Sequence, residues 1–394
     1  MKTDFYRLSQ LPSYVFAEVN QHKADKRQAG FDVIDFGMGN PTSKPPENVI
    51  SKLSEAVAKE NIHGYSTSKG IKGLRKAQAN YYKKRFNVDL DPESELIVSI
   101  GSKEGLSSLA LAISGPGDQI IVPDPSYPIH SWGFIIAGAD VVRIKHETPR
   151  EFLEQFKQHV ETSHTKPLAV IVNYPCNPTA QIVDLEFYEE LVDFCRNKKI
   201  YIISDLAYAE IYFGDTPPPS ILQVKGAKDV AIEYSSVSKT YSMAGWRIGF
   251  AAGNKDLIAA LGRIKSYLDY GIFTPLQIAA TVAINEADDY IANIREEYKL
   301  RRDILVENLQ QANWQVTIPE ASMFVWTKLP EQYQDLSSLE FSKLLLENAN
   351  VAVSPGAGFG AGGEGYIRIS IVENTMRTRQ GAKNIKKFLL QNAK

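Results

Sequence analysis

The sequence predicts an α/β fold: a large domain whose mostly parallel sheet is covered by helices on both faces, followed by a small α+β domain. Three observations favour it. Short apolar runs alternate with helical patterns through the middle of the chain, as in parallel sheets with crossover helices. After about residue 312 the pattern changes character. The 394 residues are sufficient for one large and one smaller domain.

The large domain is predicted to contain seven strands with helices between them. The predicted strands are residues 96–100, 119–122, 139–144, 168–173, 200–204, 230–235 and 247–252. Helical patterns occupy residues 103–114, 185–198 and 255–263. Residues 276–312 are charged, amphipathic and free of proline, so we expect one long helix that leaves the large domain.

The C-terminal part is predicted to form the small domain. Its expected elements, in order, are two strands within residues 314–329, a helix at 337–347, a glycine-rich loop at 355–365, a strand at 366–371 and a helix after Asn374. Asn374 suits the N-cap of the last helix. Its apolar stripe is Ala382, Ile385, Phe388 and Leu389. We expect residues 1–36 to be an N-terminal arm and part of the small domain, 37–285 the large domain, and 286–394 the C-terminal small domain.

Composition excludes several classes of function. A formal net charge of -2 and a sequence pI near 6.4 do not suit a protein that binds nucleic acid or anionic lipid. No run approaches the roughly 20 apolar residues of a membrane span, and Met1–Gln10 is too polar for a signal peptide. Cys176 and Cys195 lack the spacing of metal ligands. We expect a cytoplasmic protein without a metal site.

The most informative segment is Ser236-Val237-Ser238-Lys239, which is followed by Thr240-Tyr241-Ser242-Met243-Ala244-Gly245-Trp246-Arg247. A lysine amine can condense with an aldehyde, while serine hydroxyls and an arginine can bind a phosphate dianion. These are the groups that hold pyridoxal 5'-phosphate. A solvated surface lysine is the alternative for Ser-x-Ser-Lys alone, and the spacing from Lys239 to Arg247 makes that alternative less favourable.

Ligands of open α/β sheets bind at the carboxyl ends of the strands, so polar residues after the predicted strands are further candidates. Gly101, Ser102 and Lys103 open a helix whose N-terminus favours a phosphate, although a simple helix cap is the alternative. Asp205 follows a strand that should be buried, where an unpaired carboxylate is costly. We expect it to hold the proton of the pyridinium nitrogen; capping of the next helix is the alternative.

Three more residues are candidates for contacts with the cofactor ring. Asn177, which lies between two prolines, and Tyr208 could reach its phenolic oxygen, and Tyr127 could stack on its face. A polar turn and core packing are the respective alternatives for Asn177 and Tyr208. Cys176 and His130 lie nearby in the sequence, and we assign them no role.

Arg368 is the candidate for substrate binding. It lies in the apolar stretch Tyr366–Ser370, where a guanidinium needs an anion, and its planar fork suits a carboxylate. An internal salt bridge is the alternative. The Gly37–Pro41 run, which includes Gly39, would let the backbone approach the same carboxylate closely.

Together these residues resemble the fold type I, pyridoxal-phosphate-dependent aminotransferases of class I and II, and the resemblance covers nearly the whole chain. It implies the roles given above for Lys239, Asp205, Asn177, Tyr208, Tyr127, Arg247 and Arg368, and a phosphate loop that includes Gly101, Ser102, Ser236 and Ser238. It also implies a homodimer with active sites at the interface. Tyr65 should then reach the phosphate of the neighbouring subunit.

Within this family, four segments look like the bacterial glutamate-pyruvate (alanine) transaminases: Ser13–Phe16, Met38–Pro41, Gly64–Thr67 and Pro125–His130. The LL-diaminopimelate aminotransferases are similar too, and their residues matching Tyr14, Gly39 and Lys103 touch substrate. Aspartate aminotransferases carry an arginine ahead of the proline that matches Pro275. Residues 266–274 contain none, which argues against aspartate as substrate.

The expected reaction is ping-pong transfer of an amino group between an L-amino acid and a 2-oxo acid, most simply alanine or glutamate with pyruvate or 2-oxoglutarate. Lys239 is expected to act as the general base and Arg368 to orient the substrate. The alternatives are aminotransferases for LL-diaminopimelate, aspartate or methionine, and a carbon-sulfur β-lyase. A noncatalytic sensory module is disfavoured because Lys239 is intact and no DNA-binding segment is present.

Overall fold

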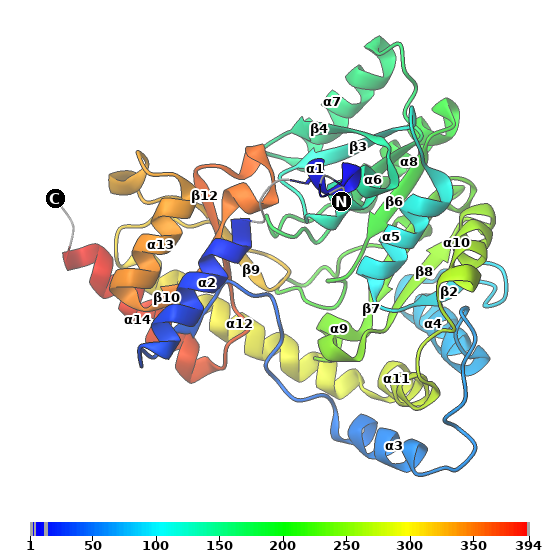
Figure 1. The fold of residues 1–394 in the computed structure, drawn as a ribbon, viewed down its shortest axis with the longest axis horizontal. Coiled ribbons are helices and arrows are strands. Elements are labelled where there is room, and N and C mark those ends of the chain that lie inside the picture. Colours follow the sequence, from blue (N-terminus) through cyan, green and yellow to red (C-terminus); the bar gives the residue numbers. More distant parts are fainter. Residues whose placement is uncertain (1–2, 4, 12–14, 392–394) are drawn as a thin grey trace.

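The computed structural model describes residue 3, residues 5–11 and residues 15–391 of the chain. The molecule has a large lobe around a seven-stranded sheet and a small lobe around a three-stranded sheet. Helix α12 (Asp288–Gln310) runs from one lobe into the other, as Figure 1 shows. The N-terminal helix α2 (Val15–Gln28) lies against the small lobe, where it contacts α13 (Ser338–Ala349).

The large sheet confirms the predicted α/β class. Its strands lie in the order β2-β8-β7-β6-β5-β3-β4. Strand β8 is antiparallel to both of its neighbours, and the other pairs are parallel. The bounds are β2 (Leu96–Ser99), β3 (Gln119–Asp124), β4 (Asp140–Lys145), β5 (Ala169–Asn173), β6 (Tyr201–Asp205), β7 (Ala231–Ser236) and β8 (Gly249–Gly253). All seven strands were predicted, with ends that differ by at most two residues.

Helices cover both faces of this sheet, because alternate residues of its buried strands point to opposite sides. In β5, Val170 and Val172 belong to one hydrophobic cluster and Ile171 to another. One face is covered by α5 (Ser102–Ile113), α6 (Ile129–Ala137) and α10 (Lys255–Leu268). The other is covered by α3 (Glu47–Val57), α4 (Lys72–Phe86), α7 (Pro149–Thr162), α8 (Leu185–Lys198) and α11 (Thr274–Glu286). Two further helices, α1 (Tyr6–Ser9) and α9 (Val237–Thr240), are only one turn long.

The prediction of one helix over residues 276–312 is wrong. The segment forms two helices, α11 and α12, separated at Ala287, whose φ of -111° and ψ of 31° are not helical. Helix α11 packs on α3 and α4 in the large lobe, whereas α12 packs on α14 (Thr375–Gln391) in the small lobe. The chain therefore changes direction between two packing surfaces, a constraint that the local sequence does not carry. Helix α10 also extends five residues beyond its predicted end.

The small lobe joins the C-terminal part to the N-terminal arm. Its sheet has the order β11-β12-β9 with antiparallel pairs, and β1 (Ile34–Asp35) pairs with β10 (Val351–Ala352) in parallel. The bounds are β9 (Phe324–Lys328), β11 (Ser354–Pro355) and β12 (Tyr366–Ser370). As predicted, Asn374 caps α14, because its Oδ1 accepts from Arg377 N at 2.9 Å.

Only one of the two strands predicted within residues 314–329 is present. Residues 315–319 are irregular, and this segment is tied to β9 by side chains instead of a backbone ladder. Trp314 Nε1 donates to the Lys328 carbonyl at 2.9 Å, and Thr327 Oγ1 lies 3.3 Å from the Gln315 carbonyl. The prediction failed because an apolar segment can be buried beside a sheet without pairing with it.

Among the described residues, no helix combines the length and apolar character that crossing a bilayer requires. Nor does that part of the chain group three or more histidine, cysteine, aspartate or glutamate side chains in a way that could hold a metal ion.

Candidate active site

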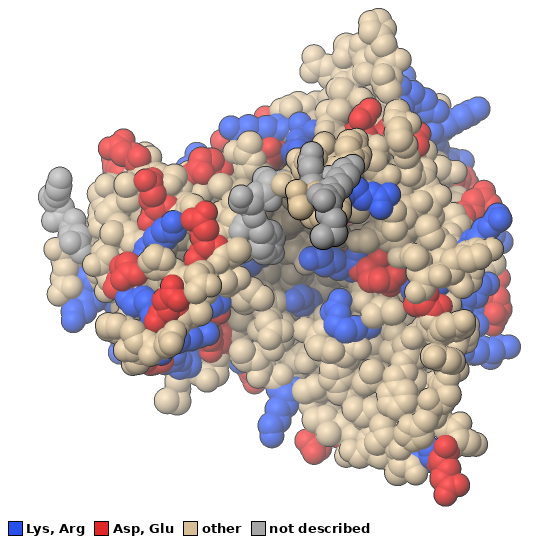
Figure 2. Space-filling view, in the orientation of Figure 1, with Lys and Arg blue, Asp and Glu red and all other residues tan. Residues whose placement is uncertain are grey.

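A cleft of about 600 Å³ lies between the two lobes, at the carboxyl ends of β5, β6 and β7. Figure 2 shows this face of the molecule hollowed between the lobes, with lysine and arginine side chains in the hollow. The cleft is lined by most of the predicted site residues: Gly39, Ser102, Lys103, Tyr127, Asn177, Asp205, Tyr208, Ser236, Ser238, Lys239, Arg247 and Arg368. The fold thus brings together residues that are spread over 330 positions of the sequence.

One end of the cleft is formed by the start of α5 and the side chain of Arg247. The N-cap Gly101 has a φ of 81°, and no side chain caps the helix. A Cβ at Gly101 would lie 2.1 Å from Arg247 Nη2, so only glycine lets the guanidinium approach the first turn of α5. Gly101 therefore shapes this end without lining the cleft. Arg247 is held by its Nη1, which donates to the Ala244 carbonyl at 2.9 Å.

Lys239 lies on the floor of the cleft, in the one-turn helix α9 that follows β7. Ser236 caps this turn, because its Oγ accepts from Ser238 N at 3.1 Å. The ammonium group donates to the Gly39 carbonyl. Burial, and then the charges of Arg368 and Arg247, lower the pKa of Lys239 to about 8. At pH 7 the ammonium form of Lys239 still dominates, but the free amine that a nucleophile or base requires is far more abundant than for a lysine with the usual pKa.

Asp205 ends β6 and faces the cleft. Its Oδ2 lies 3.0 Å from His130 Nε2, and its Oδ1 accepts from Ala207 N at 3.2 Å. Asn173 Nδ2 donates to the Asp205 carbonyl at 2.7 Å. A turn follows β6, so Asp205 does not cap a helix, which was the alternative explanation. The Asp205 carboxylate is instead held by the buried ring of His130, and it also lines the cleft.

His130 is the functional residue that the sequence analysis missed. It is fully buried at the start of α6, and its Nδ1 has no hydrogen-bond partner among the residues that the structure describes. Its ring also meets the edge of the Tyr127 ring, at 5.8 Å between centroids. A histidine in the first turn of a mostly apolar helix, three positions after Tyr127, was the available signal, but its partner Asp205 lies 75 positions away.

The small-lobe end of the cleft is built around Arg368, in the middle of β12. Its Nη1 donates to Asn177 Oδ1 at 2.7 Å, and its Nη2 donates to the Gly37 carbonyl at 2.8 Å. The guanidinium lies over the rings of Phe324 and Phe359, at 4.1 and 4.7 Å from their centroids. These contacts with two carbonyl oxygens and two aromatic faces fix the plane of the guanidinium.

Tyr208 packs between these two ends. Its ring meets Phe324 edge-on, with centroids 5.6 Å apart, and burial raises its pKa well above the usual value despite the opposing charge of Arg368. Its hydroxyl is therefore a proton donor at every pH of interest. Asn177 accepts from Arg368 with its oxygen, so its amide nitrogen is the group left to donate into the cleft.

Tyr65 does not line this cleft in the single chain. Tyr65 is 89% exposed and stacks on Tyr270, itself 66% exposed, with ring centroids 4.7 Å apart. Tyr14 lies outside the described residues. Neither observation tests the roles expected for them.

Comparisons with known proteins agree with this geometry. The family model described as aminotransferase class I and II matches residues 32–384. The glutamate-pyruvate aminotransferase AlaC of Escherichia coli (strain K12) is 48% identical over 97% of this chain and 93% of its own. The LL-diaminopimelate aminotransferase of Aquifex aeolicus (strain VF5) is 42% identical over 98% of both chains. The solved structure of substrate-bound BacF from Bacillus subtilis superposes with a TM-score of 0.89, at 31% identity and 98% coverage of both chains.

Proposed function

The chain belongs to the class I and II aminotransferases, and on this premise we propose that it uses pyridoxal 5'-phosphate to exchange amino groups between alanine or glutamate and pyruvate or 2-oxoglutarate. One observation carries the cofactor assignment. Lys239, whose pKa is lowered to about 8, lines the same cleft as Arg247, Arg368 and the carboxylate of Asp205.

The residues of the cleft fit this cofactor. The Arg247 guanidinium lies against Gly101, next to the start of α5, where no side chain caps the helix. This positively charged end of the cleft suits a phosphate dianion. Ser236, Ser238 and the N-terminal turn of α5 add donors at the same end. Asp205, backed by His130, suits a protonated ring nitrogen, and Tyr127 offers a ring face at the cleft wall. The lysines and arginines that line the cleft outnumber its one carboxylate, so a bound anion improves its charge balance.

When bound, the cofactor supplies an electron sink for the bond that breaks at the substrate α-carbon. Lys239 Nζ takes the proton from that carbon, which its lowered pKa permits near neutral pH. Arg368 binds the α-carboxylate with its planar fork, and the contacts with Asn177 and Gly37 orient that fork. Asn177 and Tyr208 donate toward the phenolic oxygen of the ring.

Three features support alanine and glutamate as substrates. Identity to the glutamate-pyruvate aminotransferase is higher than to the LL-diaminopimelate enzyme, 48% against 42%. Residues 266–274 contain no arginine for the second carboxylate of aspartate. Lys103 at the cleft wall, with its ammonium 6.0 Å from the Tyr127 ring centroid, supplies a cation that a longer dicarboxylic acid such as glutamate could reach.

Single-turnover mixing tests this proposal. Purified protein loaded with pyridoxal 5'-phosphate is mixed separately with alanine, glutamate, aspartate, methionine and LL-diaminopimelate, and the loss of the cofactor's visible absorbance is timed. We expect alanine and glutamate to react fastest. A faster reaction with LL-diaminopimelate would reassign the substrate. Pyruvate released from cystathionine without any 2-oxo acid acceptor would indicate a carbon-sulfur β-lyase instead.

We also propose that the enzyme works as a homodimer in which Tyr65 completes the phosphate site of the partner. Its exposure supports this, together with that of Tyr267 and Tyr270, because exposed aromatic residues are typical of an interface. Mixing the two inactive variants Lys239→Ala and Tyr65→Ala under exchange conditions should restore activity, since one site of each mixed dimer is intact. If the mixture stays inactive while sedimentation shows mixed dimers, Tyr65 does not act across the interface.

A further inference from the structure

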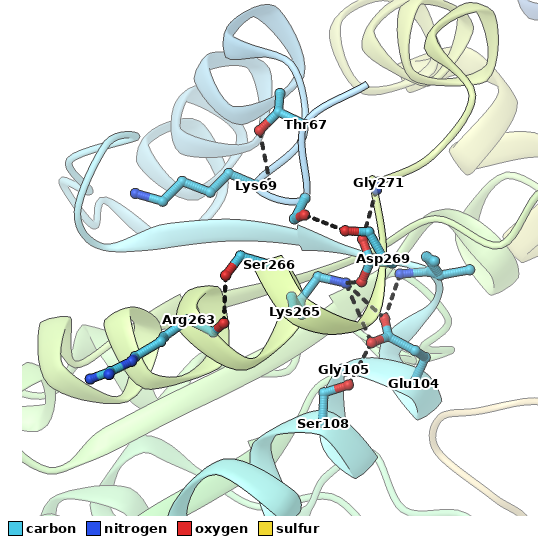
Figure 3. Close-up of polar contacts among 12 residues, drawn as sticks. Thr67, Lys69, Glu104, Gly105, Ser108, Arg263, Lys265, Ser266, Asp269 and Gly271 are labelled. Carbon is cyan, nitrogen blue, oxygen red and sulfur yellow. Dashed lines mark hydrogen bonds and ion pairs between the residues drawn. The ribbon is translucent and has the colours of Figure 1, made fainter. Parts of the chain in front are cut away.

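Lys265 is a charged residue with no access to solvent, on the last turn of α10 (Figure 3). Its Nζ lies 3.2 Å from Glu104 Oε2 and 2.7 Å from Asp269 Oδ2. A buried ammonium is costly unless carboxylates hold it, so the two ion pairs explain how the fold tolerates it. Lys265 does not line the cleft, and nothing in the proposed reaction uses it.

The first partner, Glu104, lies in the first turn of α5, next to the residues that form the phosphate end of the cleft. Its Oε2 accepts from Ile100 N at 2.8 Å and its Oε1 from Ser108 Oγ at 2.6 Å. Ser102 and Lys103 line the cleft, whereas Glu104 does not, and Figure 3 shows the Glu104 carboxylate directed toward Lys265. A carboxylate in the first turn stabilises the helix itself, but it repels a second anion that binds at the same N-terminus.

The second partner, Asp269, connects this cluster to another part of the large lobe. Ser68 Oγ donates to the Asp269 carbonyl at 2.6 Å, and Gly271 N donates to Asp269 Oδ1 at 2.7 Å. Figure 3 shows Lys265 between the start of α5 and this loop. Asp269 therefore holds Lys265 as well, and it ties this cluster to the segment that contains Ser68.

We propose that Lys265 is a buried counter-charge for Glu104 that allows the N-terminus of α5 to accept the cofactor phosphate. In this role Lys265 is a positioning residue: it offsets the negative charge that α5 carries in its own first turn, and it holds that carboxylate toward the protein interior. The inference rests on the proposed function, because it places the phosphate of pyridoxal 5'-phosphate at the start of α5.

The test compares two ligands that differ only in the phosphate. The full-length protein is freed of cofactor, and the dissociation constants of pyridoxal 5'-phosphate and of pyridoxal are measured by absorbance. We expect Lys265→Met to raise the dissociation constant of pyridoxal 5'-phosphate at least about tenfold and that of pyridoxal less than about twofold. The reason is that only the phosphate is repelled by the Glu104 carboxylate once Lys265 no longer balances its charge. Glu104→Gln, which keeps an acceptor for Ile100 N, should bind pyridoxal 5'-phosphate at least as tightly as the wild type.

The double variant Lys265→Met/Glu104→Gln should regain most of the lost affinity, whereas Lys265→Met/Asp269→Asn should regain less. The matched control is Lys26→Met, which removes another buried lysine, paired with Glu347 at 3.5 Å in the small lobe. It should leave the ratio of the two dissociation constants unchanged.

Two results would overturn the proposal. The first is that Lys265→Met raises the dissociation constants of both ligands equally, which indicates a purely structural role. The second is that Glu104→Gln binds pyridoxal 5'-phosphate more weakly than the wild type while its affinity for pyridoxal is unchanged. If Lys265→Met does not fold, the Glu104→Gln result alone decides. Failure of the wild-type protein to bind pyridoxal 5'-phosphate would instead refute the proposed function, so the two failures are distinguishable.

Discussion

The two ends of the cleft are built differently. The large-lobe end consists of one loop and one helix: Lys239 and Arg247 lie in the connection from β7 to β8, and the guanidinium rests against Gly101 at the start of α5. The small-lobe end draws Gly37, Asn177, Ser354 and Arg368 from four separate segments. A local, tightly packed end suits a cofactor that stays bound, whereas an end assembled from both lobes suits a substrate that must enter and leave.

Hydrogen bonds between the two lobes fix the geometry of the small-lobe end of the cleft. The Arg368 to Asn177 bond crosses from β12 to the loop after β5. Next to it, Asp124 at the end of β3 accepts from Gly362 N at 3.0 Å, and Ser126 N donates to the Phe359 carbonyl at 2.9 Å. A relative movement of the lobes would therefore change the substrate end while leaving the cofactor end intact.

The largest expected effect comes from Lys239, the amine of the large-lobe end. Replacing Lys239 by Ala should lower kcat for alanine with 2-oxoglutarate by about 10⁴-fold, because the general base is lost. Bound cofactor should remain, since Arg247 and α5 still hold the phosphate. Steady-state assays and absorbance spectra measure the two quantities. Lys228→Ala, which removes a partly exposed partner of Glu95, is the control. Turnover that survives in Lys239→Ala would refute the mechanism.

Replacing Arg368 by Ala should impair substrate binding at the small-lobe end and leave cofactor binding nearly unchanged. We expect kcat/KM to fall about 10³-fold, since removing one partner of a buried charge pair costs about 4 kcal/mol. The dissociation constant of the cofactor should change less than about twofold. Arg368→Lys should restore little, because an ammonium cannot reproduce the planar fork. Comparable losses in cofactor and substrate binding would show that the two ends are not separate.

Replacing Arg247 by Ala should weaken cofactor binding at the large-lobe end and leave substrate recognition nearly unchanged. The dissociation constant of pyridoxal 5'-phosphate should rise about 10²-fold, because charge-assisted hydrogen bonds to the phosphate are lost. At saturating cofactor, kcat/KM should change less than about fivefold. Gly101→Ala should act in the same direction, since its Cβ would collide with Arg247 and its φ of 81° disfavours alanine. An unchanged cofactor affinity in both variants would place the phosphate elsewhere.

The smallest expected effect is on the titration of Lys239 in protein without cofactor. Its pKa of about 8 means that the ammonium form dominates below pH 8 and the free amine above it. Positive neighbours disfavour the ammonium, so Arg368→Ala and Arg247→Ala should each raise this pKa, and by less than about one unit because burial is the main cause. Nuclear magnetic resonance of ¹³C-methylated lysines measures the midpoint, and Lys239→Ala assigns the signal. A wild-type midpoint near 10.5 would contradict the burial of this amine.

The sequence was sufficient where chemistry is encoded locally. The strand that ends at Asp205 and the segment from Ser236 to Arg247 place their functional groups by short-range pattern, and the structure brings them to one cleft. His130 was missed because its importance comes from Asp205, which is distant in the sequence. The break at Ala287 was missed for a similar reason, since packing on two lobes decides it. The expectation for Tyr65 came from family resemblance alone, because the contact expected for it is with a second subunit.

The difference between the two ends also has a consequence for how the molecule is made. At the large-lobe end, Arg247 lies eight positions after Lys239 and 146 positions after Gly101, whereas Asn177 and Arg368 at the other end are 191 positions apart. Closing a short loop costs less entropy than closing a long one, so near neighbours meet first. During synthesis, the segments from α5 to β8 emerge before β12 exists. We expect a nascent chain to capture its cofactor before it can recognise any amino acid.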